Sequence, residues 1–587
     1  MDKQGYKGIR VTEYALLAAA ALLCVFKHSL VTSLPIEARY YATDDFLMVQ
    51  MAEGLLSGNW LGAYDPVILM KGAFFPLFLA ASNRFGSSYL STLNLMNTLA
   101  CVFFVWQMRH LFRDRRLLFP LFVVLLFEPC TFSGRTFQRV YRSSLTWMQV
   151  LFLFGSYFGL YLRGKEHLKT GRWTQPGRDV ILFLVAGFSL WAMWNSREES
   201  SWVIPFVLVA TVLLLIDLLG ALRTQKDARA AIGMRLLCCL LPFLILFGGN
   251  QWIRWENARH YGVSLRLEEV DGEFAETLKT IYSIKNETDI PYVTVSREKL
   301  ERLYAASPSL QSIQPEVEAQ MDRFAGADRN RLDREVEDGW FFWGLKRAAF
   351  DNGVADTLPK SQQFWKQVRV ELEEALASPN SGLERQPVMP SALMSPWRSE
   401  FLSEIPGAFT DGLKYLVTFK GVGPSFELES YTGQYITRRF ELVTNNLSVY
   451  APSQAPLDEH LHASLVYPSF AVLERIVRIY QVLNRYVLLV SLPAYLVFVP
   501  VCAVKKRSIH VPFILIILGM VLSALVMFAG VIYTDISAFP AVNKFFYMNG
   551  IYPLMLSCEW LTLLYLSEQI LQRRRAPHTI RERESGT

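Results

Sequence analysis

Long apolar runs are the feature that most limits what this chain can fold into. Several of them approach the roughly 20 residues that an α-helix needs to cross the hydrocarbon core of a membrane. We predict membrane-spanning helices at 12–34, 88–110, 117–132, 144–162, 179–195, 202–222, 235–254, 486–504, 510–532 and 550–570. Charged residues make up only 19% of the 587 residues, below the quarter that is usual in soluble domains. The sequence therefore predicts a mainly α, polytopic membrane protein with about ten transmembrane helices.

Lysine and arginine gather in the short loops on one side of these predicted spans. Cytoplasmic loops of membrane proteins are enriched in both residues. The basic clusters are Lys3, Lys7 and Arg10; Arg109, Arg113, Arg115 and Arg116; Arg163, Lys165, Lys169, Arg172 and Arg178; Arg223, Lys226, Arg229 and Arg235; Lys505, Lys506 and Arg507; Arg573, Arg574 and Arg575. All of them share the cytoplasmic side if the chain has ten spans and both ends inside. The first run lacks a convincing cleavage site, so we expect it to stay as an anchor.

This topology places three segments on the outer side: 35–86, 256–480 and 533–549. We therefore expect an N-terminal transmembrane module over 1–255, a mainly helical extracytoplasmic domain over 256–480 and C-terminal transmembrane helices over 481–587. The domain would be inserted between the seventh and eighth spans. Its apolar residues follow helical spacing at 300–304, 313–324, 340–350 and 364–376. It contains no cysteine, so no disulfide framework supports it.

Two adjacent carboxylates, Asp44 and Asp45, follow the first span and precede a helix-patterned stretch. Neighbouring carboxylates repel, which raises the pKa of one of them. Such a group can deprotonate an acceptor hydroxyl, and such a pair can hold a divalent cation such as Mg or Mn. The simpler interpretation is the acidic start of a surface helix, where aspartate interacts favourably with the helix dipole. The spacing alone leaves both interpretations open.

The segment around this pair resembles the first outer loop of the GT-C superfamily of membrane glycosyltransferases. It is closest to the branch that contains protein O-mannosyltransferases and the aminoarabinose transferase that modifies lipid A. The matching residues are Asp44-Asp45 for the family's acidic pair, Ala52 for its alanine, Gly58-Asn59-Trp60 for its tryptophan element and Lys71 for its lysine. The departures are Asp45 in place of glutamate, Met48 in place of an aromatic residue and Gly72-Ala73 in place of two prolines. The match is close only within 35–86 and looser across the membrane part.

This resemblance implies an inverting glycosyltransferase that takes a sugar from a polyprenyl-phosphate-linked donor on the outer leaflet. The acceptor hydroxyl would belong to a glycan, a lipid or a protein. Asp44 would be the general base, and Asp45 would orient the acceptor or bind a cation. Lys71, and Tyr547 before the last span, would contact the substrates. The resemblance also implies a bacterial inner membrane, with the active site facing the periplasm or the exterior.

Three arginines without acidic neighbours, Arg135, Arg139 and Arg142, lie between the third and fourth spans on the predicted outer side. This placement runs against the positive-inside tendency. Arginine grips phosphate with two parallel hydrogen bonds, so the three predict a site for the donor phosphate. Contact with anionic lipid headgroups, or ion pairs with the outer domain, is the alternative.

A short turn between the fifth and sixth spans carries Arg197, Glu198 and Glu199. Charges at this depth are costly unless they are paired or functional. A similar turn lies beside the donor pocket in several GT-C relatives. That likeness implies Arg197 as a further ligand of the donor phosphate and the two glutamates as substrate contacts. A hairpin salt bridge among these residues is the alternative.

Two competing functions remain. A polysaccharide polymerase or ligase of the O-antigen type also has many spans and outward arginines, but it usually lacks an acidic pair after the first span. A transporter tends to have internal repeats and broken helices at mid-membrane, and the sequence has little of either. A net charge of +6 over 587 residues argues against nucleic acid as a partner. No zinc-type histidine spacing, P-loop or Rossmann glycine pattern is present.

Overall fold

The computed structural model describes residues 3–171, 173, 176–325, 334–389, 395–425, 433–448, 456–538 and 544–575. The described part consists of helices and connecting loops, with four isolated β-bridges and no β-strand. The predicted mainly α class is therefore confirmed. The predicted basic residue Arg172 lies outside the described residues, as do the side chains of Lys3, Lys7, Arg10, Arg574 and Arg575.

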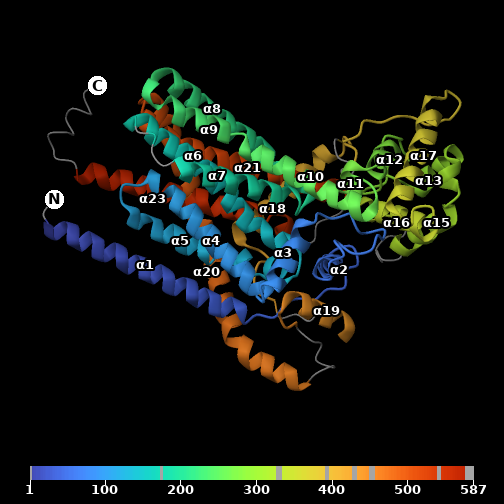
Figure 1. Ribbon diagram of the computed structural model, residues 1–587, viewed down its shortest axis with the longest axis horizontal. Helices are drawn as coiled ribbons and strands as arrows, with labels where there is room; N and C mark the ends of the chain where they lie inside the picture. Colours follow the sequence, from blue (N-terminus) through green and yellow to red (C-terminus); the bar gives the residue numbers. More distant parts are fainter. Residues whose placement is uncertain are drawn as a thin grey trace.

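The elongated bundle to the left in Figure 1 contains the membrane helices. They are α1 (Lys3–Thr32), α4 (Tyr89–Met108), α5 (Leu118–Leu126), α6 (Thr146–Thr170), α7 (Pro176–Trp194), α8 (Ile204–Thr224), α9 (Arg229–Cys238), α10 (Leu241–Tyr261), α20 (Pro456–Val504), α21 (Val511–Ser537) and α23 (Ile551–Arg575). Within the described residues, eight helical stretches are long and apolar enough to cross a membrane: Thr12–Thr32, Tyr89–Leu111, Arg142–Thr170, Gly177–Trp194, Glu198–Thr224, Lys226–Tyr261, Pro468–Val504 and Ser508–Ser537. The chain is an integral membrane protein.

Two further predicted spans correspond to helices outside this set of eight. The span expected at 117–132 is helix α5, which has 9 residues and ends before the buried Glu128 and Pro129. Nine helical residues extend about 14 Å, less than half of the hydrocarbon thickness. The span expected at 550–570 is α23, which has 25 residues but carries two buried carboxylates, Glu559 and Glu568. Both helices pack inside the bundle, α23 against α20 and α21, and α5 against α4.

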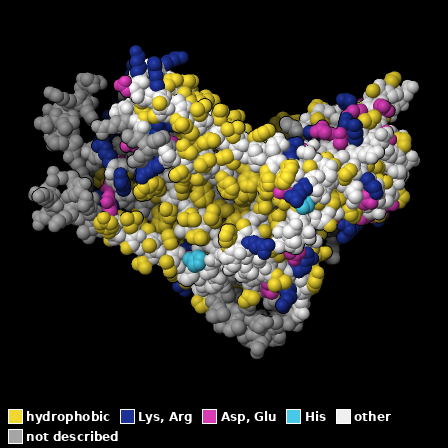
Figure 2. Space-filling view, viewed as in Figure 1, with side chains coloured by type: hydrophobic (Ala, Val, Ile, Leu, Met, Phe, Trp, Pro, Cys, Tyr) yellow, Lys and Arg dark blue, Asp and Glu magenta, His cyan; other side chains and the backbone are white. Residues whose placement is uncertain are grey.

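Apolar side chains cover the outer surface of the bundle, as Figure 2 shows for one face. The exposed apolar residues include Leu95 and Leu99 of α4, Val209 and Ile216 of α8, and Leu244 and Phe247 of α10. Large exposed apolar surfaces on a soluble protein would drive association, whereas lipid tails cover them without cost. This surface agrees with a bundle that sits in a bilayer.

A separate helical domain lies at the end of the bundle opposite both described ends of the chain (Figure 1). Its helices are α11 (Glu268–Asp271), α12 (Glu273–Tyr282), α13 (Arg297–Ala306), α14 (Pro308–Gln311), α15 (Gln314–Ala325), α16 (Asp338–Asp351) and α17 (Leu358–Ala377). They surround their own apolar core, which includes Phe274, Leu303 and Trp365. The four segments predicted to be helical from their apolar spacing lie in α13, α15, α16 and α17. We call α11–α17 the outer domain, after the side of the membrane predicted for it.

The remaining α-helices are α2 (Asp45–Leu56), α3 (Phe74–Arg84), α18 (Phe401–Thr418), α19 (Gln434–Thr444) and α22 (Lys544–Tyr547). Helix α18 packs against α20 and α21, and α19 packs against α2 and α3. Leu416 and Phe440 accordingly belong to the core of the bundle. The C-terminal part of the expected 256–480 domain thus packs with the membrane helices, and only α11–α17 form a separate core.

Candidate functional site

The candidate site lies where the first outer segment meets the loop between α5 and α6. Just after α1, the backbone N–H of Glu37 donates to the carbonyl of Gln138 at 3.0 Å, so the two segments run side by side. Helix α2 then begins at Asp45, and Asp44 precedes it without making a side-chain capping hydrogen bond. The carboxylate of Asp44 is therefore not used to cap the helix.

The carboxylate of Asp44 is 35% exposed and lies within a ring of donors and cations. The hydroxyl of Tyr141 donates to its Oδ1 at 2.8 Å, and the Nζ of Lys71 lies 4.0 Å from the same atom. Burial raises the pKa of this carboxyl, but the charges of Lys71, Arg139 and Arg142 outweigh burial and hold the pKa below its usual value. Asp44 is consequently an ionised carboxylate at neutral pH, with one side open to solvent.

Asp45 has a different environment, because its side chain is 0% exposed. Arg139 grips it with two hydrogen bonds, from Nε to Oδ1 at 2.6 Å and from Nη2 to Oδ2 at 2.5 Å. Burial raises the pKa of Asp45, and the paired guanidinium opposes that rise. The guanidinium also lies over the rings of Tyr141 and Phe546, at 4.6 and 5.0 Å from their centroids. This pair fixes the start of α2 against the loop that carries Arg139.

Arg142 is also held by protein groups. Its Nε donates to the hydroxyl of Tyr141 at 3.0 Å, and its Nη1 bonds to the carbonyl of Ser196 and forms an ion pair with Glu198. The hydroxyl of Tyr141 thus accepts from Arg142 and donates to Asp44. A continuous polar chain runs from Glu198 through Arg142 and Tyr141 to Asp44.

Arg197 and Tyr547 also belong to this group of residues around Asp44. Arg197 forms an ion pair with Glu199, and its guanidinium lies 5.4 Å from the ring centroid of Phe546 and 5.7 Å from that of Tyr547. Within the described residues, its buried Nε has no hydrogen-bond partner. The charges that act on the Tyr547 hydroxyl include those of Arg197 and Asp44. The ring of Phe546 therefore lies close to two guanidinium groups, those of Arg139 and Arg197.

The remaining predicted arginine, Arg135, has another neighbour. It lies on the π-helical turn Gly134–Gln138, where its charge acts on the buried carboxyl of Glu37.

The structure gathers nine of the ten predicted site residues in one place: Asp44, Asp45, Lys71, Arg139, Arg142, Arg197, Glu198, Glu199 and Tyr547. The roles expected of them stay predictions.

The outer domain contributes a carboxyl that the sequence did not bring to notice. Glu269 of α11 is 2% exposed, and its Oε1 has no hydrogen-bond partner among the described residues. Burial raises the pKa of Glu269 well above its usual range, and the negative charge of the neighbouring Glu198 adds to the rise. The charge of Lys71 opposes this rise in the pKa of Glu269. Glu269 is thus a buried carboxyl whose neutral form is favoured by burial and by the charge of Glu198.

The preceding residue, Glu268, links the outer domain to the first outer segment, 35–86. Its backbone N–H donates to the carbonyl of Leu69 at 2.9 Å, and its buried carboxylate pairs with Lys346 and accepts from the hydroxyl of Tyr64 at 2.9 Å. Met70 inserts into the core of the outer domain. Lys71 follows directly, so these contacts position its ammonium beside Asp44.

The tryptophan element has an anchoring role in this arrangement. The indole N–H of Trp60 donates to Oδ1 of Asn257 at 2.8 Å, and its ring meets Trp252 edge-on at a centroid distance of 5.4 Å. Both partners lie on α10, which leads into the outer domain. Trp60 therefore ties the first outer segment to the helix from which the outer domain extends.

No protein-family model, curated protein or solved structure matches the chain. The functional argument therefore depends on the geometry of the site itself. The described residues contain no group of three histidine, cysteine or acidic side chains that fits a metal ion. Both oxygens of Asp45 are taken by Arg139, and Asp44 faces Lys71 and Tyr141. The residues around Asp44 do not fit the divalent cation that the acidic pair suggested.

Proposed function

We propose that this protein is an inverting glycosyltransferase that acts on the outer face of the membrane. It moves a sugar from a polyprenyl-phosphate-linked donor to an acceptor hydroxyl. The observation that supports this most directly is the carboxylate of Asp44, ionised, partly exposed and surrounded by cations. The proposal includes the GT-C-like arrangement of ten spans in a bacterial inner membrane, with the outer domain on the periplasmic side.

Asp44 is the general base in this proposal. Its free side accepts the proton of the acceptor hydroxyl while that oxygen attacks the anomeric carbon of the donor sugar. The bond between the anomeric carbon and the phosphate oxygen breaks, and polyprenyl phosphate leaves with the bonding electrons. Attack from the side opposite to the leaving group inverts the configuration at the anomeric carbon.

The cations near Asp44 favour a leaving phosphate, although not all are equally available. Arg139 and Arg142 are engaged by Asp45 and Glu198. Lys71, 4.0 Å from Asp44, and Arg197, with an unused buried Nε, retain donors for a phosphate oxygen. We assign the donor phosphate to these two side chains. Phosphate bound there offsets the positive charges around Asp44 and raises the pKa of its carboxyl, so the carboxylate becomes a stronger base once the donor is bound.

An apolar groove on the bundle suits the polyprenyl chain of such a donor. The groove has a volume of about 320 Å³ and lies between α1, α5, α20 and α23, with Phe26, Phe127, Val487 and Trp560 in its lining. Phe26 stands six residues before the end of α1, from which the chain leads to Asp44. A lipid tail in this groove would have its phosphate near the outer ends of the helices.

The test measures consumption of the donor. Purified protein is reconstituted with polyprenyl-phosphate sugars extracted from host membranes and with a host membrane fraction as the source of acceptors. Mass spectrometry then follows each lipid-linked sugar and the polyprenyl phosphate released. We expect wild-type protein to consume one donor and Asp44→Asn to be slower by about 10²–10⁴-fold, because general-base catalysis contributes that much.

The matched control is Asp356→Asn, which neutralises a carboxylate of the outer domain that is paired with Lys360 at 2.9 Å. This variant should keep the wild-type rate and melting temperature. Asp44→Asn should stay folded but melt at a lower temperature, because nearby cations stabilise the carboxylate that it removes. Full activity in Asp44→Asn contradicts the base assignment. Absence of donor consumption by wild-type protein, or lengthening of a glycan on its lipid carrier, contradicts the proposed reaction and favours a transporter or a polymerase, respectively.

A further inference from the structure

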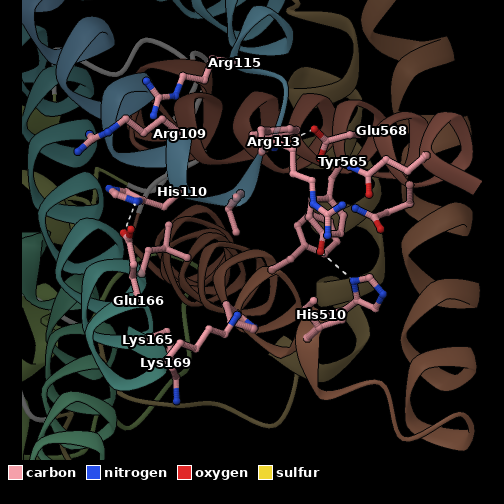
Figure 3. Close-up of a pocket in the computed structure, with 18 residues that line it drawn as sticks. Arg109, His110, Arg113, Arg115, Lys165, Glu166, Lys169, His510, Tyr565 and Glu568 are labelled. Atoms are coloured by element: carbon pink, nitrogen blue, oxygen red, sulfur yellow. Dashed lines mark hydrogen bonds and ion pairs between the residues drawn. The ribbon is translucent and has the colours of Figure 1, made fainter. Parts of the chain in front are cut away.

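A second charged site lies at the other end of the bundle, in a cavity of about 450 Å³. Figure 3 shows its lining, which comes from the end of α4, from α6, from the segment before α21 and from α23. Helix α4 connects the two sites, because the hydroxyl of Tyr89 at its start donates to the carbonyl of Arg139 at 3.1 Å. The 20 residues of α4 rise about 30 Å, the thickness of the hydrocarbon core. The cavity therefore opens on the opposite membrane face, which the positive-inside tendency assigns to the cytoplasm.

The lining of this cavity is strongly basic. It contains five Lys and Arg side chains (Arg109, Arg113, Arg115, Lys165 and Lys169) but only two carboxylates, Glu166 and Glu568. Lys165 pairs with Asp217 at 2.8 Å, outside the lining. Within the described residues, no carboxylate lies within salt-bridge distance of the other four cations.

The two carboxylates of the lining are engaged by other groups. Glu568 accepts from the backbone N–H groups of Arg113 and Asp114, both at 2.8 Å, and so fixes the loop after α4. Glu166 lies 2.9 Å from Nδ1 of His110, whose buried Nε2 has no hydrogen-bond partner in the described part of the chain. The cavity thus combines unneutralised cations with an unused buried imidazole nitrogen.

We propose that this cavity binds a phosphate group, carried by an anionic lipid headgroup of the adjacent leaflet or by a soluble phosphorylated compound. Gathered like charges repel, and a bound anion relieves this repulsion. A guanidinium group can donate two parallel hydrogen bonds to a phosphate group. The volume of the cavity also lies within the range of sites that bind small ligands. The site is independent of the proposed sugar transfer, because it lies at the far end of α4.

The basic lining of the cavity can be distinguished from the general enrichment of lysine and arginine on this face. The connection from α8 to α9, including the helix ends that flank it, carries Arg223, Lys226 and Arg229, which are all exposed and line no part of the cavity. That loop belongs to the same predicted face and has a similar charge. It therefore supplies a matched control for binding that depends only on surface charge.

The test uses the full-length protein in a neutral detergent. It is titrated with dihexanoyl-phosphatidylglycerol, with dihexanoyl-phosphatidylcholine as the zwitterionic comparison, and separately with inorganic pyrophosphate. Arg113→Gln/Lys169→Gln removes two exposed cations of the cavity, and Arg223→Gln/Lys226→Gln removes two from the control loop. We expect saturable binding of one anionic probe, weakened at least about tenfold by the cavity variant and less than about twofold by the control variant.

The probe that binds identifies the source of the phosphate: phosphatidylglycerol indicates a lipid headgroup, and pyrophosphate a soluble compound. The single variant Lys169→Gln changes one exposed side chain and should weaken binding by about fivefold without altering the melting temperature. Equal weakening by the cavity and control variants, or no saturable binding of either anionic probe, overturns the proposal.

Discussion

At the scale of single residues, Asp44 and Asp45 show how two adjacent carboxylates acquire different properties. The side chain of Asp45 is fully buried and gripped by Arg139, whereas that of Asp44 is partly exposed and contacts a hydroxyl and an ammonium. Repulsion between the two carboxylates contributes little to the difference between their pKa values. Burial is the largest influence on each carboxyl, and the number of nearby cations decides the direction for Asp44. One carboxylate holds the site together and the other is available to a substrate.

Tyr141 is the residue that joins Asp44 to Arg142, and Tyr141→Phe removes its hydroxyl alone. The hydrogen bond to Asp44 favours the carboxylate form, so its loss should raise the pKa of Asp44 toward the usual value. The acid limb of the pH–rate profile should therefore move to higher pH. Looser positioning of Asp44 should also lower the maximal rate of donor consumption by about tenfold or more. Both effects are read from transfer rates measured across pH.

The same substitution has a consequence for stability. A carboxyl whose pKa is lowered by folding stabilises the folded protein above its unfolded pKa, and this contribution is lost as the pH falls through the folded pKa. Tyr141→Phe should therefore lose less stability on acidification than wild-type protein. Tyr89→Phe is the control, because that hydroxyl bonds to the carbonyl of Arg139 and not to Asp44. An unshifted acid limb in Tyr141→Phe would contradict its role as a positioning residue.

At the scale of elements, the first outer segment is shaped by close contacts with two other parts of the chain. Met70 enters the core of the outer domain, and the backbone N–H of Phe74 donates to the carbonyl of Asn195 at 3.0 Å, at the end of α7. Gly72 lies between these two anchors, where an added Cβ would meet that same carbonyl oxygen at 2.0 Å. Only glycine permits this approach, and it places Lys71 beside Asp44.

Gly72→Ala should separate the segment from α7. We expect a loss of about 1–3 kcal/mol in stability, typical of overpacking, together with a marked drop in donor consumption as Lys71 moves. Gly177→Ala is the matched control, because a Cβ at that position of α7 meets nothing within 4 Å. Melting temperature and transfer rate are measured for both. A Gly72→Ala protein as stable and as active as Gly177→Ala would show that this contact does not position the site.

At the scale of the whole molecule, the two sites lie at opposite ends of an apolar bundle. The outer domain is at one end, and the described ends of the chain are at the other (Figure 1). The start of α4 contacts the loop of Arg139 beside Asp45, whereas the basic cavity follows the end of α4. An apolar surface between two polar ends is what a bilayer selects. The positive-inside tendency then assigns the basic end to the cytoplasm.

This orientation is tested by labelling single added cysteines. Asn380→Cys lies on an exposed turn after α17 and Arg223→Cys at the exposed end of α8. The seven native cysteines are buried or half-buried, so they give little background. A membrane-impermeant maleimide should label Asn380→Cys on intact cells and Arg223→Cys only after permeabilisation. The reverse pattern would invert the orientation, and labelling of both on intact cells would contradict a fixed topology.

Local patterns were sufficient to predict most helices. Apolar runs predicted the helices of the bundle, and helical spacing of apolar residues predicted α13, α15, α16 and α17, because both signals repeat within a few residues. The nine-residue α5 shows the limit of this approach. Its apolar run continues to Phe132, but the helix ends at Leu126 before Glu128 and Pro129. A hydropathy pattern does not register that interruption.

The candidate site could be predicted only in part. Residue type and position drew attention to three residues: Asp44 as one of two adjacent carboxylates, Arg142 as an arginine on the side where arginine is uncommon, and Arg197 as a charge at a depth where charges are costly. Tyr141 was missed although it stands next to Arg142, because tyrosine is common at interfaces and no pattern distinguishes one that joins two charges. Glu269 was missed because nothing near it in sequence points to Glu198. The adjacent glutamates at 268–269 were the only available signal.

The sequence by itself determined that this is a helical membrane protein with a charged segment after the first apolar run, because hydropathy and charge act locally along the chain. It did not determine which charges neutralise each other. Arg139 and Arg142 were expected to bind phosphate, yet in the folded chain they face Asp45 and Glu198. Only the tertiary structure decided this, because pairing depends on distances between side chains that lie far apart in sequence. The same packing leaves Asp44 open to solvent and leaves Lys71 and Arg197 with free donors.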